Sequence, residues 1–215
     1  MGKMEILLTK ELIDSNIREF DKEEKKVEDT LEFIIKQYPN NTDIKEVMIK
    51  VAVIDSLYSS HLYRSIKSDN SDKRIHYIEV ISKRIMKIKQ LDDMLLSEDK
   101  RIRMKAIRRI ADAEESNYNR TWSFASKYCN WHNHEGFAIY DKYSRGTIYS
   151  IYKTKANGLS GKNVTYDKVL DYASYYDICE ELIVVIKERF KKKYSFKEID
   201  KFLWNFGNNN SSIAI

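Results

Sequence analysis

Four side chains within seven positions could take part in metal or thiol chemistry: Cys129, His132, His134 and Glu135. The two histidines, in the run Trp131-His132-Asn133-His134, could approach one metal ion together. A complete zinc site needs three or four ligands, and only Cys129, Glu135 or distant residues could complete this one. We therefore predict no metal site and no bound cofactor.

Cys129 lies three residues before His132, and at this spacing the thiol could be a nucleophile that the histidine activates as a general base. A buried cysteine at the end of an apolar helix is the commoner arrangement. Cys179, beside Ile178 and Leu182, has the pattern of a core residue. We predict that the two thiols are not bonded to each other. No Walker loop, dinucleotide fingerprint, zincin motif or CxxC pair occurs in the sequence.

Positive charge is concentrated in two stretches of the chain, although the formal net charge is only +5 and the pI about 8.9. The first stretch holds Lys83, Arg84, Lys87, Lys89, Lys100, Arg101, Arg103, Lys105, Arg108 and Arg109, and the second Lys187, Arg189, Lys191, Lys192, Lys193 and Lys197. Positive charge that is concentrated in a few stretches of the chain favours a surface that binds phosphate groups. The alternative is that these are ordinary solvated helix faces. Fifteen tyrosines and three tryptophans could stack on bases, or pack between helices.

The elements that must position these residues are helices. Hydrophobic residues make up 42% of the chain and charged residues 33%, with one proline and six glycines, too few for a turn-rich sheet protein. Apolar side chains recur at intervals of three and four in nearly every segment. We predict an all-α, irregular multi-helix single domain over residues 1–207, with a flexible tail at 208–215.

The helical pattern, its caps and its interruptions predict the element boundaries. One long helix or two short helices are expected over 9–37. Further helices are expected over 44–58, 75–88, 122–128, 166–173 and 175–193, one more after a cap at Ser97, another from about Asp141, and a last one from a Ser195–Glu198 capping box to Gly207. Loops are expected at 68–71, 115–119, 131–136 and 158–161.

No signal peptide and no apolar run of about 20 residues is visible, so we expect a soluble cytoplasmic protein without a membrane partner. The oligomeric state stays open.

Two segments carry a resemblance to known proteins. Ser123-Phe124-Ala125-Ser126-Lys127-Tyr128-Cys129, a polar loop, Phe137-Ala138-Ile139-Tyr140-Asp141-Lys142-Tyr143 and a terminal segment like 199–207 resemble an uncharacterised bacterial all-helical family. More remotely, residues 99–150 resemble the core of the helix-hairpin-helix (HhH-GPD) DNA glycosylase superfamily. There the second hairpin helix carries a small-residue pair, here Ala125-Ser126. A loop and an apolar segment then deliver an aspartate, here Asp141, to the start of the next helix.

The resemblance implies a DNA-binding protein that could remove a modified base. Asp141 would be the catalytic carboxylate that stabilises an oxocarbenium-like sugar, and Trp131, His132 and Tyr140 would line the pocket for a flipped base. The residues that would contact DNA are Arg101, Arg103, Lys105, Arg108 and Arg109.

Two departures from the superfamily limit what it implies. The connection at 115–119 has no glycine, so close approach of its backbone to phosphate is in doubt. Ser123 stands where bifunctional members have a lysine, which leaves a monofunctional N-glycosylase without a lyase lysine as the enzyme hypothesis. The alternatives are a non-catalytic helical interaction module of a bacterial accessory or defence system, in which Asp141 is only a helix cap, and a small-molecule binder that uses the 131–134 loop.

Overall fold

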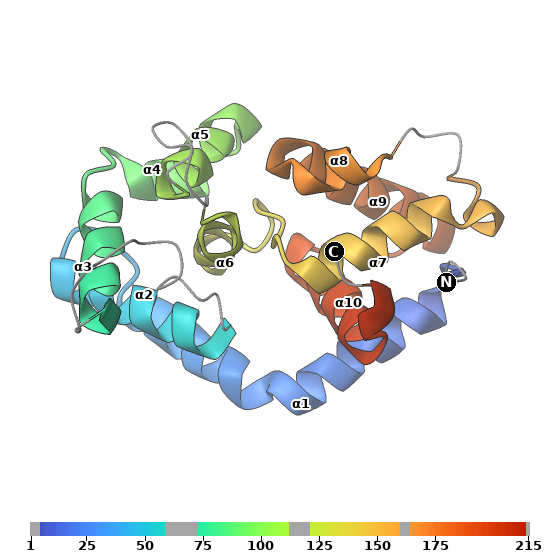
Figure 1. Ribbon diagram of the computed structural model, residues 1–215, viewed down its shortest axis with the longest axis horizontal. Helices are drawn as coiled ribbons and strands as arrows, with labels where there is room; N and C mark the ends of the chain where they lie inside the picture. Colours follow the sequence, from blue (N-terminus) through green and yellow to red (C-terminus); the bar gives the residue numbers. More distant parts are fainter. Residues whose placement is uncertain (1–4, 59–72, 112–120, 160–163, 214–215) are drawn as a thin grey trace. The chain divides into compact units, whose positions relative to one another are not determined.

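The fold of the computed structural model is helical throughout the residues that it describes, which are 5–58, 73–111, 121–159 and 164–213 (Figure 1). No strand occurs among them, which confirms the all-α prediction. The helices are α1 (Lys10–Gln37), α2 (Ile44–Tyr58), α3 (Lys73–Met86), α4 (Leu91–Leu96), α5 (Lys100–Ile110), α6 (Trp122–His132), α7 (Lys142–Lys153), α8 (Tyr166–Leu170), α9 (Tyr172–Phe190) and α10 (Phe196–Asn209), with short 3₁₀ turns η2 (Lys155–Asn157) and η3 (Ser211–Ile213).

Contacts divide the chain into two compact units. Unit 1 consists of Met1–Lys25 and Phe137–Ile215, and unit 2 of Lys26–Gly136. One boundary falls inside α1 and the other directly after the turn that follows α6. The prediction of a single domain over 1–207 stays a prediction, because a division by contacts does not decide whether the units fold independently.

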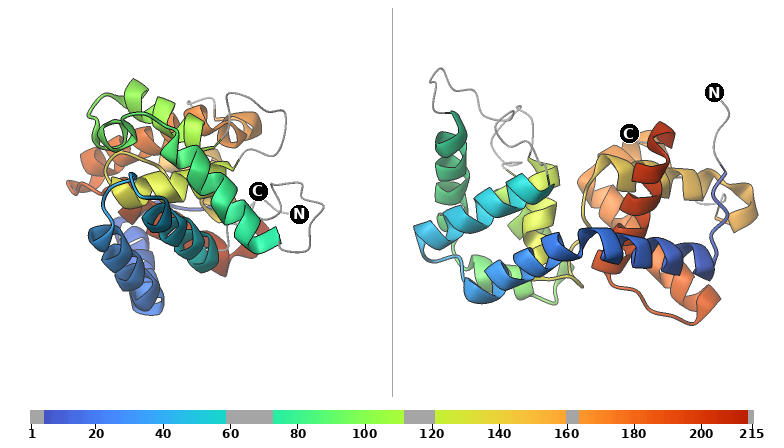
Figure 2. Two further views of the ribbon diagram at one scale, coloured as in Figure 1. Left: turned by 90° about the vertical axis from the view of Figure 1, so that its left-hand side faces the viewer. Right: turned by 90° about the horizontal axis from the view of Figure 1, so that it is seen from below.

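Unit 1 is organised around the crossing of α7 and α10, which lie against each other in both figures (Figures 1 and 2). A Cβ at Gly207 would stand 2.7 Å from Thr147 Oγ1 and 2.8 Å from the Tyr143 carbonyl oxygen. The glycine therefore permits close approach of the two helices, and α10 continues to Asn209. Our prediction that Gly207 ends this helix is wrong. The Ser195–Glu198 capping box at its start is confirmed.

Unit 2 is built around α2, which packs against α3 and α6, while α5 packs against α4 and α6. Val47, Val51 and Ile54 on α2 are fully buried. Lys50 on the same helix is fully buried as well. The apolar character of α2 predicted its central place, but not the cation inside it.

Two boundaries in unit 2 differ from the sequence prediction. The cap of α5 is Asp99, whose side chain accepts a hydrogen bond from the Arg101 backbone N–H, whereas Ser97 Oγ accepts from the Asp99 N–H one step earlier. Helix α6 continues through Trp131 and His132, which we had placed in a loop. The predicted loop at 68–71 and connection at 115–119 lie outside the described residues.

Cys129 and Cys179 are both unbonded and buried, as predicted. Among the described residues, no helix is both long and apolar enough to span a bilayer.

Candidate functional site

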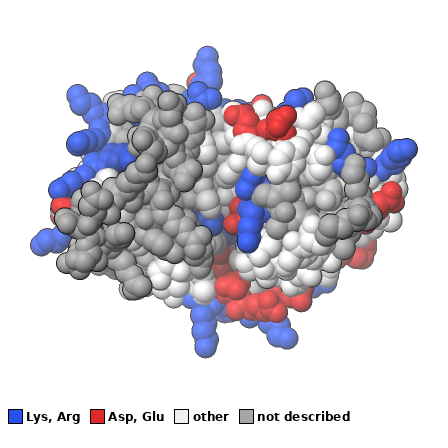
Figure 3. Space-filling view, in the orientation of Figure 1, with Lys and Arg blue, Asp and Glu red and all other residues white. Residues whose placement is uncertain are grey.

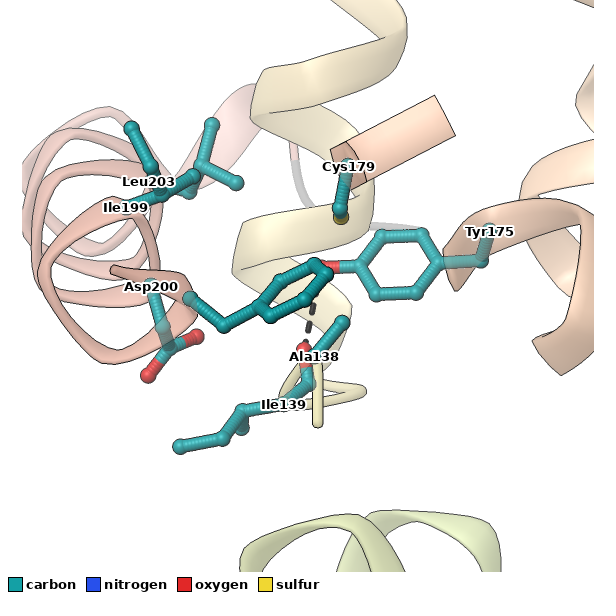
Figure 4. A pocket seen from close by; sticks show the side chains of 8 residues that line it. Ala138, Ile139, Tyr175, Cys179, Ile199, Asp200 and Leu203 are labelled. Atoms are coloured by element: carbon teal, nitrogen blue, oxygen red, sulfur yellow. Dashed lines mark hydrogen bonds between the residues drawn. The ribbon is translucent and has the colours of Figure 1, made fainter. Parts of the chain in front are cut away.

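Asp141 is held at the start of α7 by a buried segment. Phe137, Ala138 and Ile139 are at most 2% exposed. The Tyr175 hydroxyl donates to the Ile139 carbonyl oxygen at 3.0 Å (Figure 4). The Tyr172 hydroxyl donates to the Ala138 carbonyl oxygen, also at 3.0 Å. This anchoring fixes the backbone immediately before Asp141, whose side chain remains partly exposed.

The Asp141 carboxylate caps α7. Its Oδ1 accepts a hydrogen bond from the Tyr143 backbone N–H at 2.9 Å. The helix dipole and the unsatisfied N–H groups of the first turn stabilise a negative charge at such a position. The sequence prediction of a helix starting here is confirmed, and the structural role that we considered for Asp141 is present.

Tyr140 and Arg145 flank this carboxylate in the sequence and contact each other. The Arg145 guanidinium carbon lies 4.5 Å from the centre of the Tyr140 ring, and the Tyr140 hydroxyl donates to the Leu170 carbonyl oxygen at 2.7 Å. Burial is the main reason that the pKa of Tyr140 is raised. Arg145 Nε is a buried atom without a hydrogen-bond partner in the described structure. A carboxylate, a phenol and a guanidinium thus occupy adjacent positions on one unit.

A small pocket beneath the same segment offers no reactive thiol (Figure 4). Its lining includes Cys179, Tyr175 and Asp200. Burial raises the pKa of the Cys179 thiol, and Asp200 accepts a hydrogen bond from the Ser144 hydroxyl at 2.8 Å. The thiol stays protonated and the carboxylate is engaged, so this pocket is part of the packing of unit 1.

Trp131 and His132 end α6 in unit 2. Trp131 is 5% exposed, and its indole N–H donates to the Tyr58 hydroxyl at 3.1 Å. The His132 ring lies 5.1 Å from the Tyr128 ring, and its Nε2 is buried without a hydrogen-bond partner in the described structure. Burial, and then the charge of Lys50, lower the pKa of His132 to about 3. His132 is therefore a neutral, packed side chain at physiological pH.

Beside His132 runs a buried network that we call the Lys50 network: Lys50, Asn41, Asp92 and Tyr128. The Lys50 ammonium donates to the Asn41 side-chain oxygen at 2.8 Å, which also accepts from the Tyr128 hydroxyl. The Asn41 amide nitrogen donates to Asp92 at 2.6 Å. Burial lowers the pKa of Lys50 to about 8, against the opposing attraction of Asp92.

The histidine pair does not assemble a metal site in the described part of the chain. No group of three or more His, Cys, Asp and Glu side chains is suitably placed there. His134 Nδ1 lies 3.1 Å from the Asn130 side-chain oxygen, and burial raises the pKa of Cys129.

Helix α5 carries the five predicted DNA contacts, and they are not equivalent. Arg103 donates to the carbonyl oxygens of Ser97, Glu98 and Gly136 at 2.7–3.0 Å, which ties its guanidinium to the protein backbone. Arg101 forms an ion pair with Asp99 at 2.9 Å.

The other three residues are more open. Lys105 and Arg108 are exposed and Arg109 is partly exposed. From residue 73 to residue 111 the chain has twelve Lys and Arg but only five Asp and Glu. Lys and Arg side chains gather over the region of α3, α4 and α5 in Figure 3. We call Lys87, Lys89, Lys105 and Arg108, which are all exposed, the basic surface of unit 2.

The predicted site residues thus fall into two groups. Trp131, His132 and the α5 cations belong to unit 2, and Tyr140 and Asp141 to unit 1. Sequence reasoning missed Arg145 and Lys50. Arg145 follows Asp141 by four positions, the spacing that places two residues on one side of a helix end, and this signal could have identified it. A lysine within an apolar helix was the corresponding signal for Lys50.

Comparison with known proteins gives two matches. A model of the HI_0787_N family, described as an N-terminal domain, matches residues 12–136, more than half of the chain. An uncharacterised protein of Haemophilus influenzae is 27% identical over 169 residues, covering 78% of this chain and 69% of that protein. No solved structure matches. The family match ends at Gly136, where unit 2 also ends. The chain belongs to the HI_0787_N family.

Proposed function

We propose that this protein binds DNA through the basic surface of unit 2 and removes a modified base as a monofunctional N-glycosylase, with Asp141 as the catalytic carboxylate. The observation that carries the proposal is the order of elements from α5 to α7. Helices α5 and α6 pack together, a buried apolar segment follows, and Asp141 stands at the start of α7. This order agrees with the core that the glycosylase resemblance describes.

The charge distribution supports a nucleic-acid partner. The exposed cations of the basic surface lie on α5 and in the turn directly after α3, and these two helices pack against each other. Such a surface attracts phosphate and releases its counterions on binding. Arg103 has a different part: it holds the start of α5 to the turn after α6 and so helps to fix the pair of helices.

Asp141 would act on the sugar. Breaking an N-glycosidic bond leaves positive charge on the sugar, which an adjacent carboxylate stabilises. Tyr140 and Arg145, which contact each other beside it, would bind the extruded nucleotide, the guanidinium through phosphate and the ring through stacking.

No lysine of α6 is suited to a lyase step. Ser123 occupies the position where a lysine nucleophile would stand, and its hydroxyl accepts a hydrogen bond from Lys127 at 3.1 Å. Lys127 is 3% exposed and also donates to the Tyr58 carbonyl oxygen. The reaction would therefore stop at an abasic site.

A second candidate is a helical module without chemistry. The capping hydrogen bond of Asp141 favours it, because a capping aspartate contributes to stability whether or not it touches a substrate. The two candidates differ in what Asp141→Asn does.

The test is a panel of duplexes, each with one damaged or modified base, scored for abasic sites by alkaline cleavage. Asp141→Asn should abolish base release and leave DNA binding intact. The matched control is Asp43→Asn, because the exposed Asp43 side chain at the start of α2 accepts the same kind of bond, from the Lys45 backbone N–H at 2.7 Å. It should lose about 1 kcal/mol of stability and no activity. Wild-type protein that releases no base from any duplex would favour the helical module.

Binding is tested separately through its salt dependence. Each neutralised phosphate contributes about −0.9 to the slope of log affinity against log salt. Replacing Lys105 and Arg108 with glutamate should weaken duplex binding and reduce the steepness of that slope by about 2. Lys45→Glu, an exposed charge reversal on α2, is the control and should change the slope less.

A further inference from the structure

Helix α7 presents a row of cations and tyrosines, of which the steps above use only Arg145. Lys142, Arg145, Tyr149 and Lys153 are spaced by three, four and four positions, which places them along one face of the helix. Lys142 and Lys153 are exposed, and Arg145 and Tyr149 are partly exposed. Because each residue advances an α-helix by about 1.5 Å, the row extends roughly 16 Å from the end that Asp141 caps.

Each cation of this row lies over a tyrosine ring. Lys142 Nζ is 4.6 Å from the centre of the Tyr143 ring, and Lys153 Nζ is 5.4 Å from that of Tyr149. Arg145 covers Tyr140, as described above. Tyr149 also meets Tyr166 of α8 edge to face, with ring centres 6.2 Å apart. Tyr166 is 47% exposed, so the aromatic surface continues onto a second helix.

The charge of this row is uncompensated by acidic neighbours on its own helix. From Lys142 through Asn157 the chain has four Lys and Arg and no Asp or Glu. Within the described structure none of these four cations forms an ion pair with a carboxylate, whereas Arg101 of α5 and Lys83 of α3 do. Cations held on ring faces keep their positive charge and much of their exposure, which suits a ligand with both negative charge and flat apolar groups.

We propose that the α7 row, Lys142, Arg145, Tyr149 and Lys153 with Tyr166, binds an unpaired stretch of DNA strand. This inference deepens the proposed function and rests on it for the choice of nucleic acid. Phosphates of a single strand would contact the ammonium groups, while its unstacked bases would lie on the tyrosine rings. In duplex DNA these base faces are stacked on one another and cannot reach a ring. The substrate class would therefore be DNA that is single-stranded or locally opened beside the target nucleotide.

Acidic residues limit where the strand can run. Asp167 and Asp171 are exposed at α8 and at the start of α9, and Asp171 is close enough to raise the pKa of Tyr140. Phosphate would be repelled there and attracted to the opposite side of the row. The strand should follow α7 from Lys153 towards Asp141, which leads it to the catalytic carboxylate.

The experiment measures binding of a fluorescein-labelled single-stranded oligothymidylate, and of a duplex of the same length, to the full chain. Lys142→Gln with Lys153→Gln should reduce the salt slope for the single strand by about 1.4, at about 0.7 per lost phosphate contact. Tyr149→Leu should weaken single-strand binding about 5-fold or more, since stacking is lost while the side chain stays apolar. Neither change should alter duplex binding through the basic surface of unit 2 by more than about 2-fold.

Controls separate this inference from the proposed function. Lys22→Gln with Lys187→Gln removes two exposed cations of unit 1 elsewhere and should leave single-strand binding unchanged. If the α7 variants are folded by circular dichroism and bind the single strand as the wild type does, or if the wild type binds no single strand, the inference is overturned. Single-strand binding that depends on α7, without base release from any substrate, would support the α7 row and overturn the glycosylase proposal.

Discussion

The two units bury polar groups in different ways. Unit 2 encloses a cation, Lys50, and holds it with an asparagine, a tyrosine and a carboxylate. Unit 1 mostly buries tyrosines whose hydroxyls donate to backbone carbonyl oxygens, as Tyr172 and Tyr175 do, beside a buried carboxylate, Asp200. A neutral hydroxyl needs one acceptor, but a buried charge needs several partners in fixed places. Unit 2, where burial lowers the pKa of both Lys50 and His132, should therefore be the more sensitive of the two to pH.

Unit 1 does contain a strong ionic contact, but at its surface. Asp14 of α1 accepts from Lys192 at 2.8 Å and from Tyr194 at 2.7 Å, and these bonds hold the pKa of its carboxyl well below its usual range. Lys192 is 41% exposed, so water screens the pair. The comparison is thus between a charge that only protein groups stabilise and one that solvent also stabilises.

The largest effect is expected from Lys50→Met, which keeps the length of the side chain and removes its charge. The Asn40 carbonyl oxygen and the Asn41 side-chain oxygen would each lose a charged donor, and Asp92 would lose the attraction of a nearby positive charge. Each hydrogen bond from a charged donor contributes about 1.5–3 kcal/mol, so losing both should cost about 3 kcal/mol or more. Urea unfolding measures the loss, and hydrogen exchange in α6 should report it more strongly than exchange in α10.

The matched control is Lys45→Met on the same helix, where the side chain is exposed. It should change stability by less than about 0.5 kcal/mol. Equal losses in the two variants would mean that the Lys50 network is not what stabilises unit 2.

The second effect is a loss of stability in mild acid, caused by His132. Its pKa is about 3 in the folded protein and ordinarily 6.5. Below pH 6.5 the unfolded chain therefore binds a proton at this histidine, while the folded chain does not. Stability should fall as the pH drops from 6.5 to 4.5, by about 2–3 kcal/mol. The upper part of this window, above about pH 5, lies above the range in which carboxylates such as Asp14 ordinarily gain protons, so the slope measured there reports chiefly the histidine.

His132→Gln should flatten the stability profile over that window, and His134→Gln should leave it sloped. A wild-type profile that is flat from pH 6.5 to 4.5 would contradict the burial of an uncharged His132.

The sequence predicted the helices better than it predicted what they enclose. The spacing of apolar residues located α2 within its observed bounds, and the capping box located the start of α10. Both signals are local, because they depend on neighbours within one or two turns. The extra length of α6 was missed, since Trp131 and His132 read as a polar loop until the contacts with Tyr58 and Tyr128 are known.

The candidate site was predictable only where it is local. Asp141 was identified through the resemblance to the glycosylase core, and its place at the start of α7 is set by adjacent residues. The Lys50 network joins residues 41, 50, 92 and 128, and no local pattern indicates that such distant positions meet. The backbone bonds of Arg103 likewise depend on Gly136, 33 positions away, so a DNA contact was a reasonable reading of the sequence alone.

A smaller effect is expected in unit 1 from Gly207→Ala, which tests its packing rather than its charges. The new methyl group would stand 2.7 Å from Thr147 Oγ1 and 2.8 Å from the Tyr143 backbone oxygen. The backbone cannot move aside without separating α7 from α10, so we expect a loss of about 1–3 kcal/mol despite the better helix propensity of alanine. Slower exchange in α10, or a higher melting temperature, would show that the helices have room.

The smallest effect should come from Tyr175→Phe, and it sharpens the comparison most directly. The substitution removes only the hydroxyl, leaving the ring in place and the Ile139 carbonyl oxygen without this donor. A neutral hydrogen bond of this kind contributes about 1 kcal/mol, a fraction of what the buried ammonium should contribute. Tyr166→Phe, at a position that is 47% exposed, is the control and should be nearly neutral.

Because Ile139 lies two residues before Asp141, Tyr175→Phe also shows whether the anchoring of that segment serves the site. A normal rate of base release with a loss of about 1 kcal/mol would assign Tyr175 to stability alone. A rate that falls further than the loss of folded protein explains would mean that the hydroxyl holds Asp141 in its working position.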